Sequence, residues 1–263
     1  ALVTAALLCI ALPPYAPWWL ITVGIASAIF LAKHLYGGLG YNPFNPAMVG
    51  YVVLLISFPV QMTAWAPPAG AGELPSLLDA LKACFFPAAY DGVTMATPLD
   101  VLKQNNSLLI KDLWDQNVQF GRWAGLGWEW VNLAFAAGGA WLLYRKIFTW
   151  HAPVAMLLSL SFMAAIFYDG GSSASGGSPV FHLLSGATMF GAFFIITDPV
   201  TSAVSVRGRL IYGALIGVII YIIRVRGNYP DAVAFAVLIM NFAAPFIDHY
   251  TQPRTYGHDR GEQ

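Results

Sequence analysis

The stretch NPAMVGYVVLLISFP, Asn45 to Pro59, decides the fold class, because it is an apolar run bounded by helix-breaking prolines. A second stretch, GATMFGAFFIITDP from Gly186 to Pro199, resembles it, with residues 48–50 aligned on residues 189–191. The two copies fall in the third and sixth apolar segments of the chain, and this odd offset gives them opposite directions through a membrane. The pattern predicts an inverted repeat whose helix breaks frame a buried site. Coincidence between two apolar, glycine-rich helices is the alternative.

The composition indicates a chain whose solvent is largely lipid. It is 58% hydrophobic and 10% charged, with a mean hydropathy of +0.63, whereas a soluble domain is about 25% charged. The nine Trp and twelve Tyr are typical of side chains that anchor at a membrane interface. A formal net charge of zero excludes a basic surface for nucleic acid. We expect neither a disulfide nor a metal site, because Cys9, Cys84 and the five histidines show no pairing or ligand spacing.

Eight apolar segments predict an all-α integral membrane protein. They cover residues 1–12, 17–35, 44–61, 124–144, 152–168, 181–197, 209–223 and 231–247. Most reach the length of about 17–25 residues that crosses the hydrocarbon core, the sixth and seventh being marginal, and backbone groups in lipid favour helices. The first segment is short and begins without Met or a charged region, so we expect an N-terminal part of the first repeat to be missing.

The predicted spans divide the chain into four parts. Residues 1–61 hold helices of the first repeat, residues 62–122 form a long loop, residues 123–250 hold mainly the second repeat, and residues 251–263 form a tail. If the spans alternate, one side of the membrane receives Lys33, Arg145, Lys146, Arg207, Arg209, Arg254 and Arg260. The short connections of the other side receive only Arg224 and Arg226. Since basic residues favour the cytoplasm, we expect a periplasmic loop and a cytoplasmic tail.

The long loop carries the string YDGVTMATPLD, in which Asp91, Thr94, Ala96 and Thr97 fit the pattern D-x-x-[S/T]-x-A-T. This pattern resembles the site at which flavin transferases attach FMN to a Thr hydroxyl through a phosphoester. A Thr hydroxyl is a weak nucleophile that needs activation, a small Ala96 leaves room for an approaching enzyme, and Pro98 biases Thr97 toward an extended, reachable backbone. An ordinary Asp/Thr turn leading to a helix cap is the alternative.

A second string, SGAT, is a competing candidate for flavin attachment. It spans Ser185 to Thr188, and the position three residues before Ser185 is His182 rather than Asp. The string also opens an apolar span, where a transferase would have no access. We therefore expect Ser185 and Thr188 to satisfy backbone groups at a broken helix, with a flavin or ion path as the alternative.

Four strings in order carry a resemblance that covers nearly the whole chain. They are KHLYGGLGYNPFNPAMVGYVVLLISFPVQM, DGVTMATPLD, HLLSGATMFGAFFIITDPVTSA and GNYPDAVAFAVLIMNFAAPFIDHYT. With them the chain resembles the RnfD (RsxD) family of the Rnf complex, an ion-translocating ferredoxin–NAD oxidoreductase of the bacterial inner membrane. It is similar, more distantly, to the NqrB subunits of sodium-pumping NADH–quinone reductases. The resemblance implies ten transmembrane helices in two inverted five-helix repeats, of which eight segments are present here.

The resemblance also implies cofactors and partners. It places covalent FMN on Thr97, although Met95 stands where NqrB has Gly. It implies a second, noncovalent flavin, riboflavin, for which Asn42, Asn45 and Asp198 are candidates; turn and helix-end roles are the alternatives. The implied partners are the other Rnf subunits, the lipid bilayer and a flavin transferase for maturation.

The resulting functional hypothesis is a membrane electron carrier that is not catalytic on its own. Its FMN does the redox chemistry, and the protein supplies position and electrostatics. Glu129 and Asp248 are ionisable groups near the membrane segments, and we expect them to anchor at the interface rather than to handle ions. A passive channel or transporter, which an inverted repeat also suits, and a scaffold for partner subunits are the alternatives.

Overall fold

The computed structural model describes residues 1–38, 40–72, 75–86, 94–229 and 231–252. Helices dominate these residues, and two isolated β-bridges are the only strand-like pairings described. The elements are α1 (Leu2–Ala11), α2 (Trp18–Ala26), η1 (Ser27–Leu31), η2 (His34–Tyr36), α3 (Pro46–Ser57), α4 (Pro59–Met62), α5 (Leu77–Phe85), α6 (Pro98–Gln104), α7 (Ile110–Gln116), α8 (Trp128–Tyr144), α9 (His151–Ile166), α10 (Pro179–Leu184), α11 (Thr188–Phe190), η4 (Gly191–Ile195), α12 (Val206–Arg226) and α13 (Val233–Thr251).

Three helices in the described residues are long and apolar enough to cross a membrane: Trp18–Tyr36, Val206–Arg226 and Val233–Thr251. Shorter apolar helices cover Leu2–Ala11, Pro46–Ser57 and His151–Ile166. The sixth predicted segment, residues 181–197, is divided among α10, α11 and the π-helix η4. The helical class therefore agrees with the sequence-based prediction, while the predicted eight spans and the inverted repeat stay predictions.

Three helices of this chain begin with the same local device, an N-cap residue followed by proline. Asn45, Thr97 and Ser178 each accept hydrogen bonds from backbone N–H groups of the following turn, and a proline occupies the next position in each case. The side-chain oxygen satisfies an otherwise unpaired donor, and proline has no N–H to leave unpaired and a backbone angle that suits the first turn. These short signals set where α3, α6 and α10 begin.

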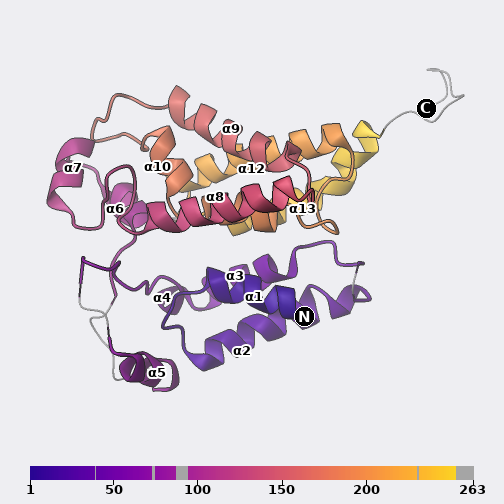
Figure 1. The fold of residues 1–263 in the computed structure, drawn as a ribbon, viewed down its shortest axis with the longest axis horizontal. Helices are drawn as coiled ribbons and strands as arrows, with labels where there is room; N and C mark the ends of the chain where they lie inside the picture. The colour runs from indigo at the N-terminus through magenta and orange to yellow at the C-terminus, as the bar shows by residue number, and fades with distance from the viewer. Residues whose placement is uncertain (39, 73–74, 87–93, 230, 253–263) are drawn as a thin grey trace, which may run out of the picture.

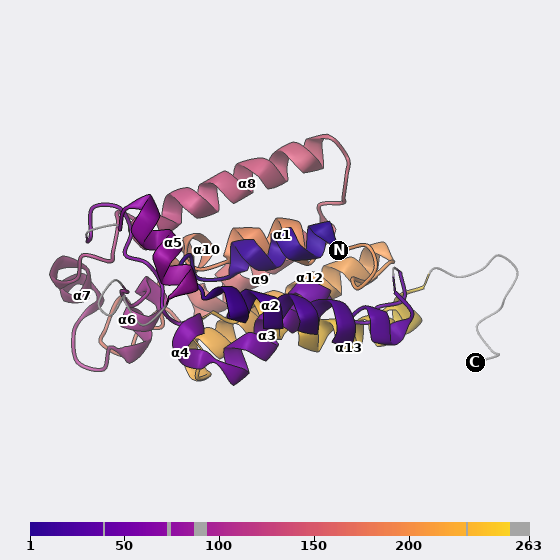
Figure 2. The ribbon, with the colours of Figure 1, turned by 90° about the horizontal axis from the view of Figure 1, so that it is seen from below.

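The helices form two groups, which Figure 1 shows one above the other. One group contains α1, α2 and α3, and the other contains α8, α9, α12 and α13, with contacts between α3 and α13 joining them. Helix α8 contacts α10, α11 and η4 and lies along the edge of its group (Figure 2). The segment that connects the two groups carries α5, α6 and α7 at one end of the molecule.

Helix α12 packs closely against α9. A Cβ atom added at Gly213 would lie 2.2 Å from the carbonyl oxygen of Ala152, and one added at Gly217 would lie 2.3 Å from that of Met156. These glycines, four residues apart on one face, let the two backbones touch, as small residues do where helices associate in lipid.

Two buried asparagines hold the broken segments. Asn241 on α13 accepts the backbone N–H of Asn45 and donates to the carbonyl of Thr201 and to the Tyr212 hydroxyl. Asn132 on α8 accepts the N–H of Met189 and donates to the carbonyl oxygens of Leu184 and Gly186. Each break lies at the start of one of the two similar stretches, so in both places a neighbouring helix satisfies backbone groups that the break leaves unpaired.

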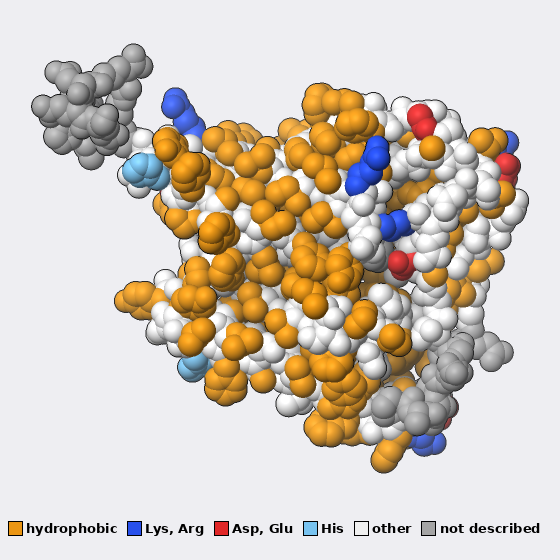
Figure 3. Space-filling view, turned by 180° about the vertical axis from the view of Figure 1, so that it is seen from behind, with side chains coloured by type: hydrophobic (Ala, Val, Ile, Leu, Met, Phe, Trp, Pro, Cys, Tyr) orange, Lys and Arg blue, Asp and Glu red, His pale blue; other side chains and the backbone are white. Residues whose placement is uncertain are grey.

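The outer surface is apolar over much of its area. Figure 3 shows one face on which hydrophobic side chains predominate and charged side chains are few. Exposed apolar residues recur at helical spacing, as with Leu158 and Phe162 on α9 and Phe242 and Phe246 on α13. A soluble monomer rarely exposes so much contiguous apolar surface, so this face is typical of contact with lipid.

Candidate functional site

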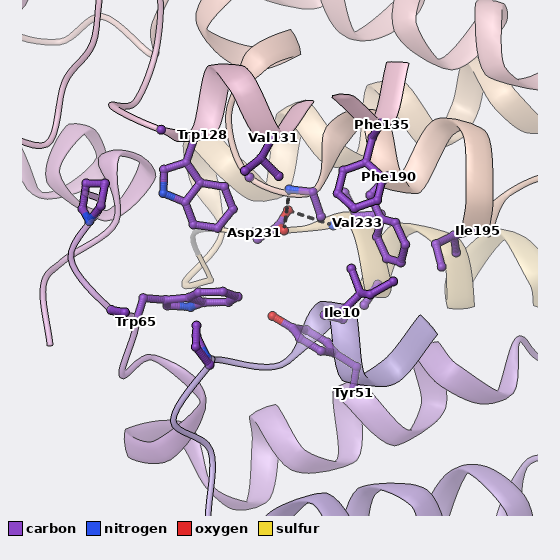
Figure 4. Close-up of a pocket in the computed structure, with 18 of the residues that line it drawn as sticks. Ile10, Tyr51, Trp65, Trp128, Val131, Phe135, Phe190, Ile195, Asp231 and Val233 are labelled. Atoms are coloured by element: carbon purple, nitrogen blue, oxygen red, sulfur yellow. Dashed lines mark hydrogen bonds between the residues drawn. The ribbon is translucent and has the colours of Figure 1, made fainter. Parts of the chain in front are cut away.

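A cavity of about 460 Å³ lies between the two helical groups. The volume falls within the range of about 300–1,000 Å³ that small-molecule sites occupy. Its lining includes Ile10 from α1, Tyr51 from α3, Phe135 from α8, Phe190 from α11 and Val233 from α13. Figure 4 shows the aromatic side chains arranged around the space from both groups. Because segments far apart in sequence build it, the cavity exists only in the folded chain.

Two tryptophans close the end of the cavity that faces the long loop. Trp65 follows α4, and Trp128 begins α8. Their ring centroids are 5.4 Å apart with the planes at 67°, an edge-to-face contact. Both also line a smaller recess of about 40 Å³. The pair therefore forms a wall that the cavity and the recess share.

Thr97 lies at this recess. It caps α6: its hydroxyl donates to the Asp100 carboxylate at 2.6 Å, while the Asp100 N–H donates to the Thr97 Oγ1 and the Thr97 N–H donates to the Asp100 carboxylate. This is a capping box in which Asp takes the usual Glu or Gln position. Five residues line both the recess and the larger cavity, namely Tyr51, Trp65, Trp128, Gly186 and Asp231. Thr97 is half-buried, so it lies at the recess with part of its surface open to solvent.

The rest of the predicted attachment motif lies close by. Thr94 and Ala96 are exposed, and the Met95 N–H donates to the carbonyl of Trp65 at 2.9 Å. That hydrogen bond ties the motif to the wall of the cavity. Asp91, the first residue of the motif, lies outside the described residues.

Ser185 and Thr188 lie inside the protein and line neither the cavity nor the recess. Both are buried, and the Thr188 hydroxyl donates to the carbonyl oxygens of His182 and Ser185. From the sequence we expect these residues to satisfy backbone groups at a broken helix, and the contacts of Thr188 have that form. The Ser185 hydroxyl has no partner among the described residues.

A buried ion pair lies behind the cavity. Arg224, in the last turn of α12, has a side chain only 1% exposed and lies 3.3 Å from the Asp231 carboxylate. It also donates to the carbonyl oxygens of His182 and Ser185 and to the Thr188 hydroxyl. A buried charge requires this kind of pairing.

A polar cavity of about 390 Å³ lies on the far side of Arg224, with Lys103 and Arg226 in its lining. Burial lowers the pKa of Lys103, and nearby Asp100 counteracts part of that shift. The Lys103 ammonium donates to the carbonyl oxygen of Tyr229 at 2.8 Å. Lys103 thus ties α6 to the segment that follows α12.

The other sequence candidates form hydrogen bonds with groups that lie close to them in the chain. Asn42 donates to the carbonyl of Phe44, and Asp198 accepts from the N–H of Val200 and the hydroxyl of Thr201. Asn45 caps α3. We find these candidates for a riboflavin contact in turns and caps.

Glu129 and Asp248 both accept hydrogen bonds from backbone N–H groups, and their interfacial role stays a prediction. Glu129 is 6% exposed and accepts the N–H of Trp123, and Asp248 accepts the N–H groups of Val204 and Ser205 just before α12. Both carboxylates thus hold backbone groups at helix ends. No cluster of three or more potential metal ligands occurs in the described part of the chain.

Sequence reasoning misses Tyr51, Asp231 and the two tryptophans of the wall, and it treats Arg224 only as a charge in a short connection. One signal for Arg224 and Asp231 is available, because an ionisable residue at the end of an apolar span is a functional candidate by default. For Tyr51 and the tryptophans no such signal exists, since aromatic residues recur throughout the membrane segments.

Comparisons with known proteins show the family of this chain. The D subunit of the ion-translocating oxidoreductase complex of Cellvibrio japonicus (strain Ueda107) is 62% identical over 266 residues, covering 99% of this chain and 75% of that protein. The protein of the same name from Pseudomonas aeruginosa (strain UCBPP-PA14) is 58% identical over 264 residues, covering 100% and 76%. That of Yersinia enterocolitica (serotype O:8 / biotype 1B) is 53% identical over 277 residues, covering 100% and 79%. A family model described as NQR2, RnfD, RnfE matches residues 1–257, and the chain therefore belongs to the NQR2, RnfD, RnfE family.

Proposed function

We propose that this chain is an electron-carrying membrane subunit of an ion-translocating oxidoreductase complex and that its carrier is FMN joined to Thr97 by a phosphoester. Membership of the family supports the first part, since its similar relatives are named as the D subunit of such a complex. The resemblance of the four sequence strings to the Rnf family further implies ferredoxin and NAD as redox partners of the complex and a place in the inner membrane. A noncovalent riboflavin is a further part of this proposal.

One observation carries the cofactor proposal: the Thr97 hydroxyl stands at a recess that shares five lining residues with an aromatic cavity of about 460 Å³. When bound, the isoalloxazine ring supplies the redox chemistry. Aromatic walls such as Trp65 and Trp128 offer flat apolar surface for a ring of that kind. A phosphate on Thr97 leaves the ring itself free to enter the cavity.

The chain's own residues prepare the attachment site. The carboxylate of Asp100 accepts a hydrogen bond from the Thr97 hydroxyl and so orients the oxygen, and the half-buried position of the residue leaves one side open. Thr188 differs from Thr97 in exposure and in the partners of its hydroxyl. It is fully buried, and its hydroxyl donates to two backbone carbonyl oxygens instead of to a carboxylate. A flavin transferase would find Thr97 accessible and Thr188 inaccessible.

The test is flavin fluorescence after denaturing electrophoresis of protein made in cells with an active flavin transferase. The wild-type band should fluoresce under ultraviolet light, and Thr97→Ala should abolish the fluorescence. Thr63→Ala is the matched control, because Thr63 lines the same recess with its hydroxyl bonded to the carbonyl of Pro59. That variant and Thr188→Ala should stay bright.

Each result has a distinct meaning. A dark wild-type band removes the covalent carrier and leaves a channel or a scaffold. A bright Thr97→Ala band together with a dark Thr188→Ala band moves the attachment to the second string.

A further inference from the structure

The aromatic cavity has one polar corner. Of the described residues that line it, only Tyr51 and Asp231 carry a side-chain oxygen. They come from different helical groups, Tyr51 from α3 and Asp231 from the turn before α13. Figure 4 shows the Tyr51 hydroxyl and the Asp231 carboxylate directed into the same space. The other side chains of the lining are apolar or aromatic, and among them only the indole N–H groups of Trp65 and Trp128 can donate a hydrogen bond. Asp231 is therefore the one oxygen-bearing side chain of the described lining that can only accept, and Tyr51 is the hydroxyl that faces it.

No hydrogen bond of the Tyr51 hydroxyl is found among the described residues, and the residue as a whole is 9% exposed. A hydroxyl that faces an apolar cavity without a partner costs free energy, and most polar groups inside native proteins are bonded to protein or to ordered water. Since the hydroxyl is directed into the cavity (Figure 4), its partner has to come from there, as water or as a bound molecule.

Asp231 is held rigidly and still presents oxygen to the cavity. Its carboxylate accepts the N–H of Ala187 at 3.1 Å and lies 3.3 Å from Arg224. The side chain is nevertheless 26% exposed, and an ionised carboxylate has about four acceptor positions. The buried guanidinium of Arg224 compensates the negative charge of the Asp231 carboxylate. The corner therefore offers a fixed acceptor from Asp231 beside a donor from Tyr51.

We propose that Asp231 and Tyr51 are positioning residues for the flavin ring, with Asp231 accepting the ring N–H and Tyr51 donating to a ring carbonyl beside it. This inference rests on the proposed function and names the groups of the same site that hold the ring. The pyrimidine edge of an isoalloxazine carries an N–H between two carbonyl groups, which matches an acceptor next to a donor. The remaining apolar ring surface matches the aromatic walls.

The arrangement has an electrostatic consequence for reduction of the ring. Added electrons raise the negative charge on the ring edge. The Asp231 carboxylate opposes that charge, and the Tyr51 hydroxyl stabilises it. Removal of one group or the other should therefore move the reduction potential in opposite directions, which general damage to the cavity would not do.

The test is a reductive titration of the flavinylated chain, followed by visible absorbance. Asp231→Asn should raise the flavin reduction potential, by about 30 mV if the ratio of reduced to oxidised flavin rises tenfold in a two-electron couple. Tyr51→Phe should lower the potential. The matched controls are Asp112→Asn and Tyr144→Phe, which make the same chemical changes at exposed positions, and they should leave the potential unchanged.

The outcomes separate this inference from the proposed function. A dark wild-type band in the fluorescence gel contradicts covalent attachment itself. Bright bands with unchanged potentials in Asp231→Asn and Tyr51→Phe, or shifts of the same sign, overturn the positioning role alone. If Asp231→Asn does not fold because the capping of Ala187 and Val233 is lost, Tyr51→Phe decides the question by itself.

Discussion

At the scale of single residues, Thr97 combines two roles that usually occur apart. Its side-chain oxygen caps α6, and the same oxygen is the proposed flavin acceptor. The cap holds the hydroxyl at a fixed place beside the recess, because reciprocal hydrogen bonds with Asp100 restrict both side chains. A helix cap and a flavin acceptor are thus compatible at this position, since an esterified oxygen can still accept a hydrogen bond.

Replacement of Thr97 by Asn should separate the two roles. Asn is at least as good an N-cap as Thr, whereas Ala at an N-cap costs about 1 kcal/mol. We expect Thr97→Asn to keep the thermal unfolding temperature of the wild type in detergent but to give a dark fluorescence band. Thr97→Ser, which keeps both the cap and the hydroxyl, should stay bright. A bright Thr97→Asn band would show that the attachment is elsewhere.

Some residues of the site could be predicted from the sequence and others could not. Thr97 could be predicted because its motif is local in sequence. Asp231 and Tyr51 could not, because their importance depends on two helical groups that lie far apart in the chain, and neither residue type is unusual where it occurs. The role of Arg224 could not be predicted for a related reason. It is buried in the last turn of α12, and a count of basic residues in the sequence does not show whether a side chain points into the protein.

At the scale of elements, the segment from α10 to η4 contains a helix break that its apolar sequence does not predict. Hydropathy marks residues 181–197 as one span, yet the chain breaks at Ser185 and continues as a π-helix. The break is stable because Asn132 satisfies three backbone groups there. Since that asparagine lies on another helix, no local pattern predicts its effect.

Two adjacent glycines of α8 provide a test of how this element is held. A Cβ added at Gly139 would lie 2.2 Å from the Phe193 ring of η4, whereas one added at Gly138 would lie 3.4 Å from Phe194. Overpacking costs about 1–3 kcal/mol, and Ala is about 1 kcal/mol better than Gly in a helix interior. Gly139→Ala should therefore lower the unfolding temperature in detergent, and Gly138→Ala should leave it unchanged or raise it. Equal effects would mean that α8 does not pack on η4 as described.

At the scale of the whole molecule, the cavity, the recess and the ion pair follow from the meeting of the two helical groups. The first group contributes Tyr51, and the second contributes Asp231 with Arg224 behind it. The helical class and the apolar surface could be predicted from composition. The meeting of the groups could not, because it depends on tertiary contacts such as that of Asn241 with the backbone of Asn45.

The proposed membrane orientation depends on the basic residues at the ends of the spans. Arg224 is buried in an ion pair, so Arg226 is left as the basic residue that the short connections of the outer side expose to solvent or headgroups. Because the positive-inside rule counts basic residues near span ends, the seven on one side against Arg224 and Arg226 on the other favour a cytoplasmic tail. A reporter that is active only outside the cytoplasm should be active when fused near Gly92 in the long loop and inactive when fused after Gln263. The reverse pattern would place Thr97 on the cytoplasmic side and would require flavin attachment to occur there.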